Sequence, residues 1–523
     1  MRAAVRGEGH SNHPETMSDI LEIHGSQLTL EDVERVAGPS SPEVRLAEQA
    51  RARVEAARAV VDRAVSEGRV AYGITTGFGA LSDVVIPADR IRELQVNLIR
   101  SHAAGVGPAL PEDETRAIVL LRANVLALGH SGVRPSIIEL LLELLNRRVH
   151  PVIPSRGSVG ASGDLAPLSH LALVLIGEGQ ASYGGEVLPG GEALRRAGLE
   201  PVVLEAKEGL ALNNGTQVQT GIGALALLRA ERALETAEVA GAMSLEGLRG
   251  TPDAFDPALQ AVRPHKGQVA SAARLRALLA ESEIRESHRY NDPRVQDAYS
   301  LRCMPQVHGA ARQAFAFVRE VLEVEINSAT DNPLIFPEEN RILSGGNFHG
   351  QPVAQALDLL AMACADLGSI SERRLARLVD PALSGLPAFL TPDPGVNSGL
   401  MMAQIVAAAL VNELKLRASP ASVDSIPTDA NKEDHVSMGV AAALKAREAV
   451  ELLETILALE LIAGAQALEF LRPLRPGRGV ARAYELVRAD VAPLERDREL
   501  SADIAAVAAR VRAGEFARLW QTC

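Results

Sequence analysis

The sequence predicts a mostly α-helical protein, with a long central helical bundle and a loop-rich N-terminal domain. Aromatic residues make up only 3% of the 523 residues, while alanine and leucine are abundant, and this composition favours packed helices over sheets. Residues 438–471 read as one helix on the order of 50 Å long. Because its second half is apolar nearly all round, we expect it to be buried in a bundle shared between subunits.

Net charge and cysteine content exclude several classes of protein. The formal net charge of −13 argues against a nucleic-acid partner, because phosphate binding needs a basic surface. No continuous apolar run reaches the roughly 18 residues that a membrane span needs. The cysteines are odd in number and far apart (Cys303, Cys364 and Cys523), which is typical of a reducing compartment. We expect a cytoplasmic protein, with residues 1–16 as a disordered extension that lacks a secretory signal.

The first part of the chain predicts short helices separated by glycine-rich loops. A short apolar segment at residues 20–23 precedes an expected helix at 44–68. Further helices are expected at 91–102, 117–128, 137–147 and 168–176, and the last follows a glycine-rich stretch, Gly157 to Leu168. Residues 177–191 read as a small excursion with short strands. We assign residues 17–219 to an N-terminal domain that carries the glycine-rich stretch.

The second part predicts long helices. They are expected at 220–248, 310–325, from 352 onward, 401–416 and 438–471. From residue 352 onward, the apolar positions 353, 357, 360, 364 and 367 fall on one helical face. In the last helix, Arg447, Glu451 and Glu454 are expected on a solvated face. We assign residues 220–480 to the central bundle and 481–523 to a C-terminal helical appendage.

Seven polar, glycine-rich segments interrupt the apolar helices, and together they suggest one composite site. They are residues 72–79, 97–107, 157–164, 213–216, 296–306, 344–351 and 427–437. No HExxH or cysteine spacing predicts a metal site, and no Gly-x-Ser-x-Gly elbow makes Ser162 a hydrolase nucleophile. We therefore expect no metal.

The composition around Ser162 fits a self-made electrophile. If the backbone bends sharply at Ala161-Ser162-Gly163, the nitrogen of Gly163 can attack the carbonyl of Ala161. Loss of water would close an imidazolone ring, and loss of the Ser162 hydroxyl would leave an exocyclic methylene. Asp164 would hold the geometry or move protons. A plain structural turn at Gly160–Gly163 remains the alternative.

The stretch Gly157-Ser158-Val159-Gly160-Ala161-Ser162-Gly163-Asp164-Leu165-Ala166-Pro167 resembles the signature of the aromatic amino acid ammonia-lyases. The other polar segments match the same family in order, from about Tyr72 to about Met438. The resemblance implies a methylidene-imidazolone (MIO) cofactor formed from Ala161, Ser162 and Gly163, with no metal and no nucleotide. It also implies a mostly helical homotetramer whose active sites are built from three subunits.

Two residues link the sequence to the histidine-acting branch of this family. His102, in Ser101-His102-Ala103-Ala104-Gly105, stands where that branch and tyrosine-acting members carry a histidine that meets the polar ring. Glu433, in Asn431-Lys432-Glu433-Asp434-His435, resembles the acid that faces the imidazole in the histidine branch. A carboxylate pairs well with an imidazole but would lack a partner beside a phenyl ring. The implied reaction is deamination of L-histidine to trans-urocanate and ammonia.

The resemblance assigns further roles residue by residue. Tyr72 looks like the general base that takes the β-proton of the substrate, and its phenol pKa would have to be lowered by the site. Arg302 resembles the clamp for the substrate carboxylate. The remaining site residues would line the electrophile and the substrate: Asn214, Gln296, Tyr299 and Phe348.

Other interpretations of these residues stay open. The Tyr72 segment could be a turn between helices. Arg302 could belong to a buried structural ion pair, and Phe348 could simply be a core residue. His349 and His435 are expected to be structural. Five positions depart from the residues usual in the family without removing a catalytic group: Thr75, Asn213, Met304, Lys432 and Gly350. A tyrosine ammonia-lyase or aminomutase is therefore an alternative, and a non-catalytic helical scaffold is a second one.

Overall fold

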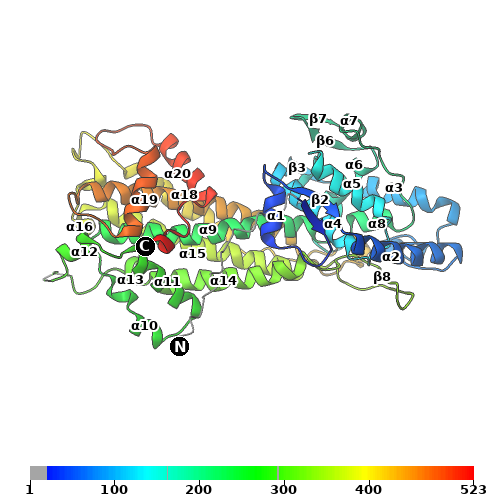
Figure 1. Ribbon diagram of the computed structural model, residues 1–523, viewed down its shortest axis with the longest axis horizontal. Helices are drawn as coiled ribbons and strands as arrows, with labels where there is room; N and C mark the ends of the chain where they lie inside the picture. The colour runs from blue at the N-terminus through cyan, green and yellow to red at the C-terminus, as the bar shows by residue number, and fades with distance from the viewer. Residues whose placement is uncertain (1–19, 162, 291, 293) are drawn as a thin grey trace, which may run out of the picture.

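Five long helices run side by side along the length of the molecule (Figure 1). They are α9 (Gln217–Gly247), α14 (Met304–Glu325), α15 (Gln351–Val379), α17 (Met401–Arg417) and α18 (Gly439–Glu469). The computed structural model describes residues 20–161, 163–290, 292 and 294–523, so Ser162 and the expected extension at 1–16 lie outside the described residues. The described residues hold twenty α-helices and a few short strands, which confirms the mostly helical fold.

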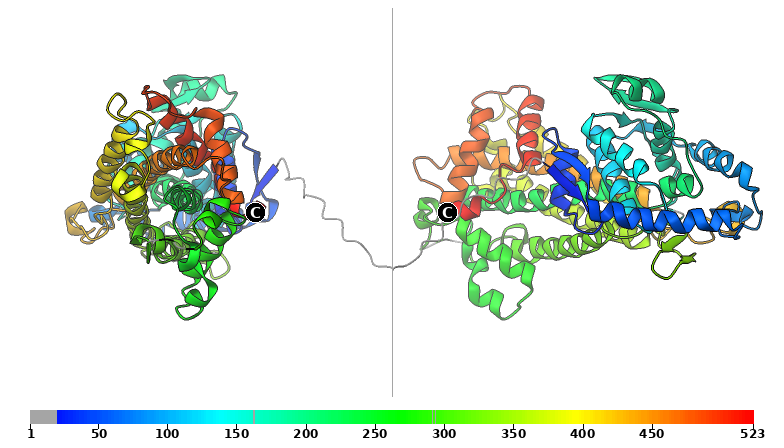
Figure 2. Two further views of the ribbon diagram at one scale, coloured as in Figure 1. Left: turned by 90° about the vertical axis from the view of Figure 1, so that its left-hand side faces the viewer. Right: turned by 45° about the vertical axis from the view of Figure 1, so that its right-hand side comes forward.

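The bundle is held together by the helices that are apolar on all sides. In α18 every residue from 456 to 468 is buried, as the sequence predicts for a helix without a polar face. The end-on view in Figure 2 shows the other helices arranged around α9, which is buried along nearly its whole length. Both helices are rich in alanine, whose small side chain lets neighbouring backbones approach closely.

Buried ion pairs bridge the helices inside the bundle. The guanidinium of Arg374 donates to the carboxylate of Glu460 at 2.5 and 2.8 Å, and both side chains are fully buried. Glu454, expected on a solvated face, is in fact buried. Its carboxylate accepts from Arg229 at 3.0 and 2.8 Å. The prediction for Glu454 was wrong because the partner charge comes from α9, more than two hundred residues earlier in the chain.

By length and composition, α15 could cross a membrane, and it is the one helix in the described parts of the chain that meets this test. The sequence contains no continuous apolar run of that length because Asp358 and Asp366 interrupt it. The helix contacts α9, α14, α17 and α18. Since 61% of its most apolar window is buried within the chain, we interpret α15 as a core helix of the bundle.

The smaller elements of the N-terminal part gather at one end of the bundle (Figure 1). The helices there are α1 (Leu30–Ala37), α2 (Glu48–Ser66), α3 (Ile91–His102), α4 (Glu112–Ala127), α5 (Pro135–Asn146), α6 (Leu165–Leu175), α7 (Gly190–Arg196) and α8 (Glu208–Asn213). The strands there are β1 (Ile20–Ile23), β2 (Glu43–Leu46), β3 (Val106–Ala109), β4 (His150–Pro151), β5 (Pro154–Arg156), β6 (Gln180–Tyr183), β7 (Glu186–Pro189), β8 (Leu334–Phe336) and β9 (Arg341–Leu343).

The strands form only small sheets. β1 pairs with β2 in parallel, with Leu21 opposite Val44, whereas β3 with β5, β4 with β6, β6 with β7 and β8 with β9 pair antiparallel. Strand β2 corrects the expected helix at 44–68, because residues 43–46 pair with β1 and bury Val44 before α2 begins. The hairpin β6–β7 confirms the expected excursion at 177–191.

Shorter helices surround the opposite end of the bundle. They are α10 (Pro257–Ala261), α11 (Lys266–Leu278), α12 (Glu283–Ser287), α13 (Tyr299–Arg302), α16 (Pro381–Ser384), α19 (Arg478–Asp490) and α20 (Ser501–Ala513). Helix α13 contacts α9, α14 and α15 at this end (Figure 1). The bundle thus separates two groups of loops by the full length of its helices.

Candidate active site

The glycine-rich stretch lies where three long helices of the bundle begin. The residue before α18, Met438, donates its N–H to the carbonyl of Val159 at 2.8 Å. The residue before α15, Gly350, donates to the carbonyl of Gly160 at 3.2 Å, and the hydroxyl of Ser437 donates to the same oxygen at 3.0 Å. The positive ends of these helix dipoles therefore converge on the stretch, where they favour negative charge.

Asp164 attaches the stretch to the third helix, α9. One carboxylate oxygen accepts the main-chain N–H groups of Val218 and Gln219, each at 2.9 Å. The other oxygen accepts from the side chains of Ser158 and Gln219, each at 3.1 Å. Complete burial raises the pKa of Asp164 to about 6, although these hydrogen bonds act to lower it. Asp164 thus satisfies N–H groups that the first turn of α9 leaves free.

The glycines of the stretch are required by close backbone contacts. Gly163 has φ of +74°, and a Cβ there would lie 2.4 Å from the main-chain nitrogen and oxygen of Gly215. Gly160 has φ of +70°, and its Cβ would lie 2.3 Å from the hydroxyl oxygen of Ser437. Ala161, between them in the chain, is buried. Gly160 and Gly163 thus have backbone conformations and close contacts that favour glycine, while Ser162 itself lies outside the described residues.

A cavity of about 580 Å³ opens beside this turn. It is lined by four residues that the sequence singled out, Tyr72, His102, Asn214 and Glu433. These residues come from separate segments: the loop after α2, the end of α3, the end of α8 and the loop before α18. Apolar side chains complete the lining, and they include Phe78, Leu94, Leu98, Leu165 and Leu210. The structure thus brings four of the expected site residues into one pocket of a size suited to a small ligand.

Tyr72 is the residue of the cavity best suited to move a proton. Its hydroxyl oxygen accepts the main-chain N–H of Gly79 at 3.3 Å. Burial raises the pKa of the Tyr72 phenol, and the carboxylates of Asp429, Glu433 and Asp331 raise it further, while the Gly79 hydrogen bond lowers it. A base at this position therefore needs positive charge from outside these groups.

His102 and Glu433 offer hydrogen-bond acceptors to the cavity. The Nδ1 atom of His102 lies 2.9 Å from the carbonyl oxygen of Leu98. Because a carbonyl oxygen only accepts, Nδ1 carries the hydrogen, and in a neutral ring Nε2 is the acceptor. The carboxylate of Glu433 accepts the hydroxyl of Thr428 at 2.6 Å, which fixes the direction of the side chain. The pair is suited to a ligand with ring N–H donors.

Asn214 lines the cavity beside the turn. Its side-chain nitrogen donates to the main-chain carbonyl of Asn332 at 3.3 Å. Its main-chain carbonyl accepts from the guanidinium of Arg122 at 2.9 Å. The side-chain oxygen is buried and accepts no hydrogen bond within the described residues. Its neighbour Gly215 forms a backbone bridge with Gly163. An unsatisfied buried oxygen here fits a donor that a ligand or the cyclised turn would supply.

Three expected site residues lie at the other end of the bundle. Arg302 and Tyr299 belong to α13, and Gln296 precedes it, whereas α3 and α8 lie at the cavity end (Figure 1). The Arg302 guanidinium carbon lies 4.6 Å from the centre of the Tyr299 ring. The two ends are separated by helices such as α9, which has 31 residues and so spans roughly 45 Å. Within one chain, Arg302 cannot reach Tyr72.

Phe348 and its neighbours lie at the cavity end, just before α15. Phe348 is half-buried. The ring of His349 stacks on that of His435 with centroids 6.0 Å apart, and its Nε2 lies 3.1 Å from the carbonyl of His435. These contacts connect the segment before α15 to the segment before α18 and favour a structural role for both histidines.

Asp429 is a cavity residue that the sequence did not single out. Its carboxylate accepts the main-chain N–H of Ala80 at 3.0 and 3.3 Å, which joins the loop before α18 to the Tyr72 loop. The sequence feature that pointed to Asp429 was its place in the polar segment at 427–437. Because nothing in a single sequence shows which loop an aspartate contacts, that signal was insufficient.

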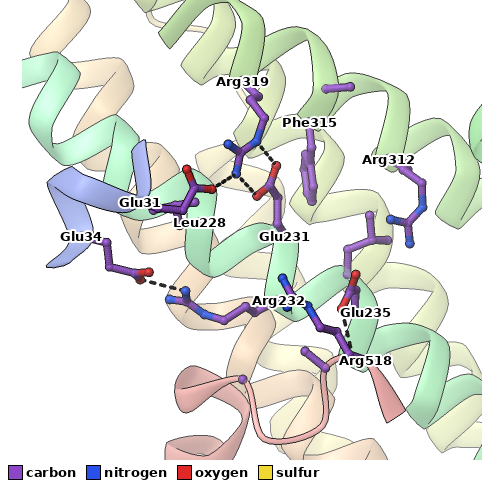
Figure 3. A pocket seen from close by; sticks show the side chains of 14 residues that line it. Glu31, Glu34, Leu228, Glu231, Arg232, Glu235, Arg312, Phe315, Arg319 and Arg518 are labelled. Carbon is purple, nitrogen blue, oxygen red and sulfur yellow. Dashed lines mark hydrogen bonds and ion pairs between the residues drawn. The ribbon is translucent and has the colours of Figure 1, made fainter. Parts of the chain in front are cut away.

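A second cavity, of about 560 Å³, lies between α1, α9, α14 and the segment at 514–518 (Figure 3). Arg319 pairs there with Glu231 at 2.6 Å and with Glu31 at 3.0 Å, and Arg232 pairs with Glu34 at 2.8 Å. None of the residues expected in the active site lines it. Since most of its charges are paired with one another, the cavity beside the glycine-rich turn is the better candidate for the chemistry.

The helical fold and the site together define a class of enzyme. A profile of the aromatic amino acid lyases matches residues 28–489, and the chain belongs to the aromatic amino acid lyase family. It is a carbon–nitrogen lyase.

Particular members of the family are similar to nearly the whole chain. A histidine ammonia-lyase from Stigmatella aurantiaca is 58% identical over 496 residues, which cover 95% of this chain and 97% of that protein. The crystal structure of histidine ammonia-lyase from Trypanosoma cruzi has a TM-score of 0.90 and 44% identity, and covers 96% of this chain and 95% of its own. A tyrosine aminomutase from Streptomyces globisporus has a TM-score of 0.90 and 40% identity, with 96% and 98% covered.

Proposed function

We propose that this enzyme converts L-histidine to trans-urocanate and ammonia without oxidation, as the first step of histidine degradation in the cytoplasm. The observation that carries the proposal is the shared cavity of Tyr72, His102 and Glu433 beside the Ala161–Gly163 turn. A base, a ring-facing acceptor and a carboxylate in one pocket match what proton removal from an imidazole-bearing amino acid requires. The 58% identity to a histidine ammonia-lyase supports the same substrate.

We infer that the cofactor is a methylidene-imidazolone made from Ala161, Ser162 and Gly163. The positive φ of Gly163 and its tight contact with Gly215 fit a turn bent for ring closure. Such a group supplies an electrophilic carbon that turns the amino group of the substrate into a leaving group. The converging starts of α9, α15 and α18 favour negative charge at this turn, and the side-chain oxygen of Asn214, which has no hydrogen-bond partner among the described residues, can accept a hydrogen bond there.

In this proposal Tyr72 removes the β-proton of the substrate. Burial, and after it the nearby carboxylates, raise the pKa of its phenol, so nearby positive charge must stabilise the phenolate. The substrate brings an ammonium group and an imidazole that can carry a proton. His102 and Glu433 hold the ring by its N–H groups, and a carboxylate stabilises the ring when it is cationic. Phe348 packs near the substrate.

We further propose a homotetramer in which a neighbouring copy supplies Gln296, Tyr299 and Arg302 to the cavity. Their distance from Tyr72 in one chain means that Arg302 cannot clamp the substrate carboxylate in the cavity of its own chain. Helix α17 supports association, because its apolar side chains Met402 and Ile405 are 55% and 48% exposed. Residues 17–219, 220–480 and 481–523 would be the active-site domain, the bundle and an appendage.

The second candidate function is a tyrosine ammonia-lyase or aminomutase, which the likeness to the Streptomyces enzyme favours. Glu433 argues against it, because a half-buried carboxylate beside a phenol ring gains less than one beside an imidazole. Equal concentrations of L-histidine and L-tyrosine should be offered to the purified protein while both deaminated products are followed by absorbance. Product from histidine alone is expected, whereas product from tyrosine alone would replace the proposal. Silence with both would favour the non-catalytic scaffold.

A further inference from the structure

Three consecutive residues before α18 adopt the left-handed backbone conformation, although none is glycine. Asp429, Ala430 and Asn431 have φ of 49°, 52° and 66°. Such a conformation costs of order 1 kcal/mol or more per residue and persists only where surrounding contacts impose it. A run of three is therefore a feature that the fold maintains for a reason.

The turn is closed by the residue that faces the substrate ring. Thr428, just before it, donates its main-chain N–H to the main-chain carbonyl of Glu433 at 2.9 Å. The main-chain N–H of Glu433 donates to the main-chain carbonyl of Thr428 at 3.3 Å. The hydroxyl of Thr428 also donates to the Glu433 carboxylate at 2.6 Å. The position of Glu433 and the shape of the turn are thus coupled through three hydrogen bonds.

The turn delivers the carboxylate of Asp429 to the Tyr72 loop. Both carboxylate oxygens lie within hydrogen-bond distance of the Ala80 N–H, at 3.0 and 3.3 Å. Gly79 allows this approach, because a Cβ there would lie 2.0 Å from an oxygen of Asp429. The same Gly79 donates its N–H to the Tyr72 hydroxyl oxygen at 3.3 Å. Asp429 and the Tyr72 hydroxyl are therefore bound by neighbouring main-chain N–H groups, those of Ala80 and Gly79.

We propose that Asp429 is a positioning residue for the reaction, which clamps the Gly79–Ala80 backbone so that Gly79 holds the Tyr72 hydroxyl toward the substrate. The proposal rests on the proposed function, in which Tyr72 is the base. The left-handed turn then links the ring-facing acid Glu433 to the base, so that both are set by one loop. In this proposal Asp429 acts through the Gly79–Ala80 backbone, to which its carboxylate is bonded.

The test compares Asp429→Ala with Asp429→Asn in the full-length protein. Alanine removes the acceptor for Ala80, whereas asparagine keeps an oxygen at the same place. For Asp429→Ala we expect kcat to fall between about tenfold and a hundredfold with KM within about twofold, since a small misplacement of a reacting group costs rate on this scale. Hydrogen exchange of residues 77–84 should accelerate. Asp429→Asn should retain at least roughly half of kcat and slow exchange, because the acceptor remains.

Asp424→Ala is the matched control, since it removes an exposed carboxylate from the same loop, whereas the Ala80 N–H is bound by Asp429. It should leave kcat and exchange unchanged. Wild-type kcat in Asp429→Ala, or a loss in Asp429→Asn as large as that in Asp429→Ala, would overturn the proposal. If the wild-type protein forms no urocanate, the proposed function fails. The exchange comparison still tests the clamp, and unchanged exchange in Asp429→Ala would refute it.

Discussion

The carboxylate of Asp164 binds Gln219 twice, through its main-chain N–H at 2.9 Å and its side-chain amide at 3.1 Å. This relationship fixes the glycine-rich turn to the start of α9, the helix around which the bundle is arranged. The Gln219 amide in turn occupies the space beside Gly350 and Gly439, where any Cβ would lie within 2.4 Å of it. The start of three helices is therefore organised around one acid and one amide.

Replacement of Asp164 by alanine should prevent formation of the cofactor. The turn would lose its connection to α9 and two buried N–H groups would lose their acceptor, so we expect about 2–4 kcal/mol lower free energy of unfolding. Intact mass spectrometry provides the direct readout, because cyclisation and dehydration lower the chain mass by two water molecules. Asp366→Ala, which removes an exposed acid on α15, should keep the lowered mass. A fully cyclised Asp164→Ala protein would contradict the role of Asp164.

The stability of the protein should carry a pH dependence from Asp164. Its folded-state pKa is raised from 3.8 to about 6, so the native state holds this proton over a range where the unfolded chain has released it. The stabilisation is present below pH 3.8 and is lost as pH rises through about 6. Denaturant unfolding at a series of pH values should therefore show this decline in the wild type relative to Asp164→Asn. Parallel curves for the two proteins would show that Asp164 does not titrate in this range.

Glu433→Gln should shift the choice of substrate. An amide retains an acceptor but loses the charge that stabilises a cationic imidazole, so kcat/KM for L-histidine should fall about tenfold to a hundredfold. The value for L-tyrosine should fall less, which lowers the ratio between the two substrates. Asp434→Asn, at the exposed neighbouring position, is the matched control and should leave the ratio unchanged. An unaltered ratio in Glu433→Gln would separate Glu433 from recognition of the ring.

Hybrid oligomers should reveal whether the site is shared. Tyr72→Phe and Arg302→Ala homo-oligomers should each be nearly inactive, because one lacks the base and the other lacks the carboxylate clamp. When the two are co-expressed, some cavities combine an intact Tyr72 from one copy with an intact Arg302 from another, and activity should return. Mixing the separately purified, non-exchanging proteins gives the baseline. Hybrids no more active than that baseline would place Tyr72 and Arg302 in unconnected sites.

Much of the architecture follows from local sequence patterns. The helix Ile91–His102 is found with the expected bounds, and the long helices differ from theirs by at most six residues at an end, because apolar periodicity and helix-ending residues are local signals. Strand β2 could not be anticipated in this way, since residues 43–46 become a strand only through pairing with β1. The burial of Glu454 likewise depends on Arg229 from another helix.

The candidate site was predictable as a set of residues but not as a geometry. The motif around Ala161 and the resemblance of the other segments indicated which side chains take part. Which of these side chains lie at which end of the bundle depends on the tertiary path of the chain. The spacing of residues in the sequence does not show it. Asp429 was missed for a related reason, because its partner Ala80 lies 349 residues away in the sequence.

Formation of urocanate tests the central claim most directly. Purified wild-type protein and its Ser162→Ala variant should be incubated with L-histidine while urocanate absorbance is followed. The wild type should produce urocanate together with an equal amount of ammonia, and the variant, which cannot form the exocyclic methylene, should produce neither at a comparable rate. Equal rates in the two proteins would contradict the origin of the electrophile in Ser162, and the absence of urocanate from both would contradict the proposed reaction.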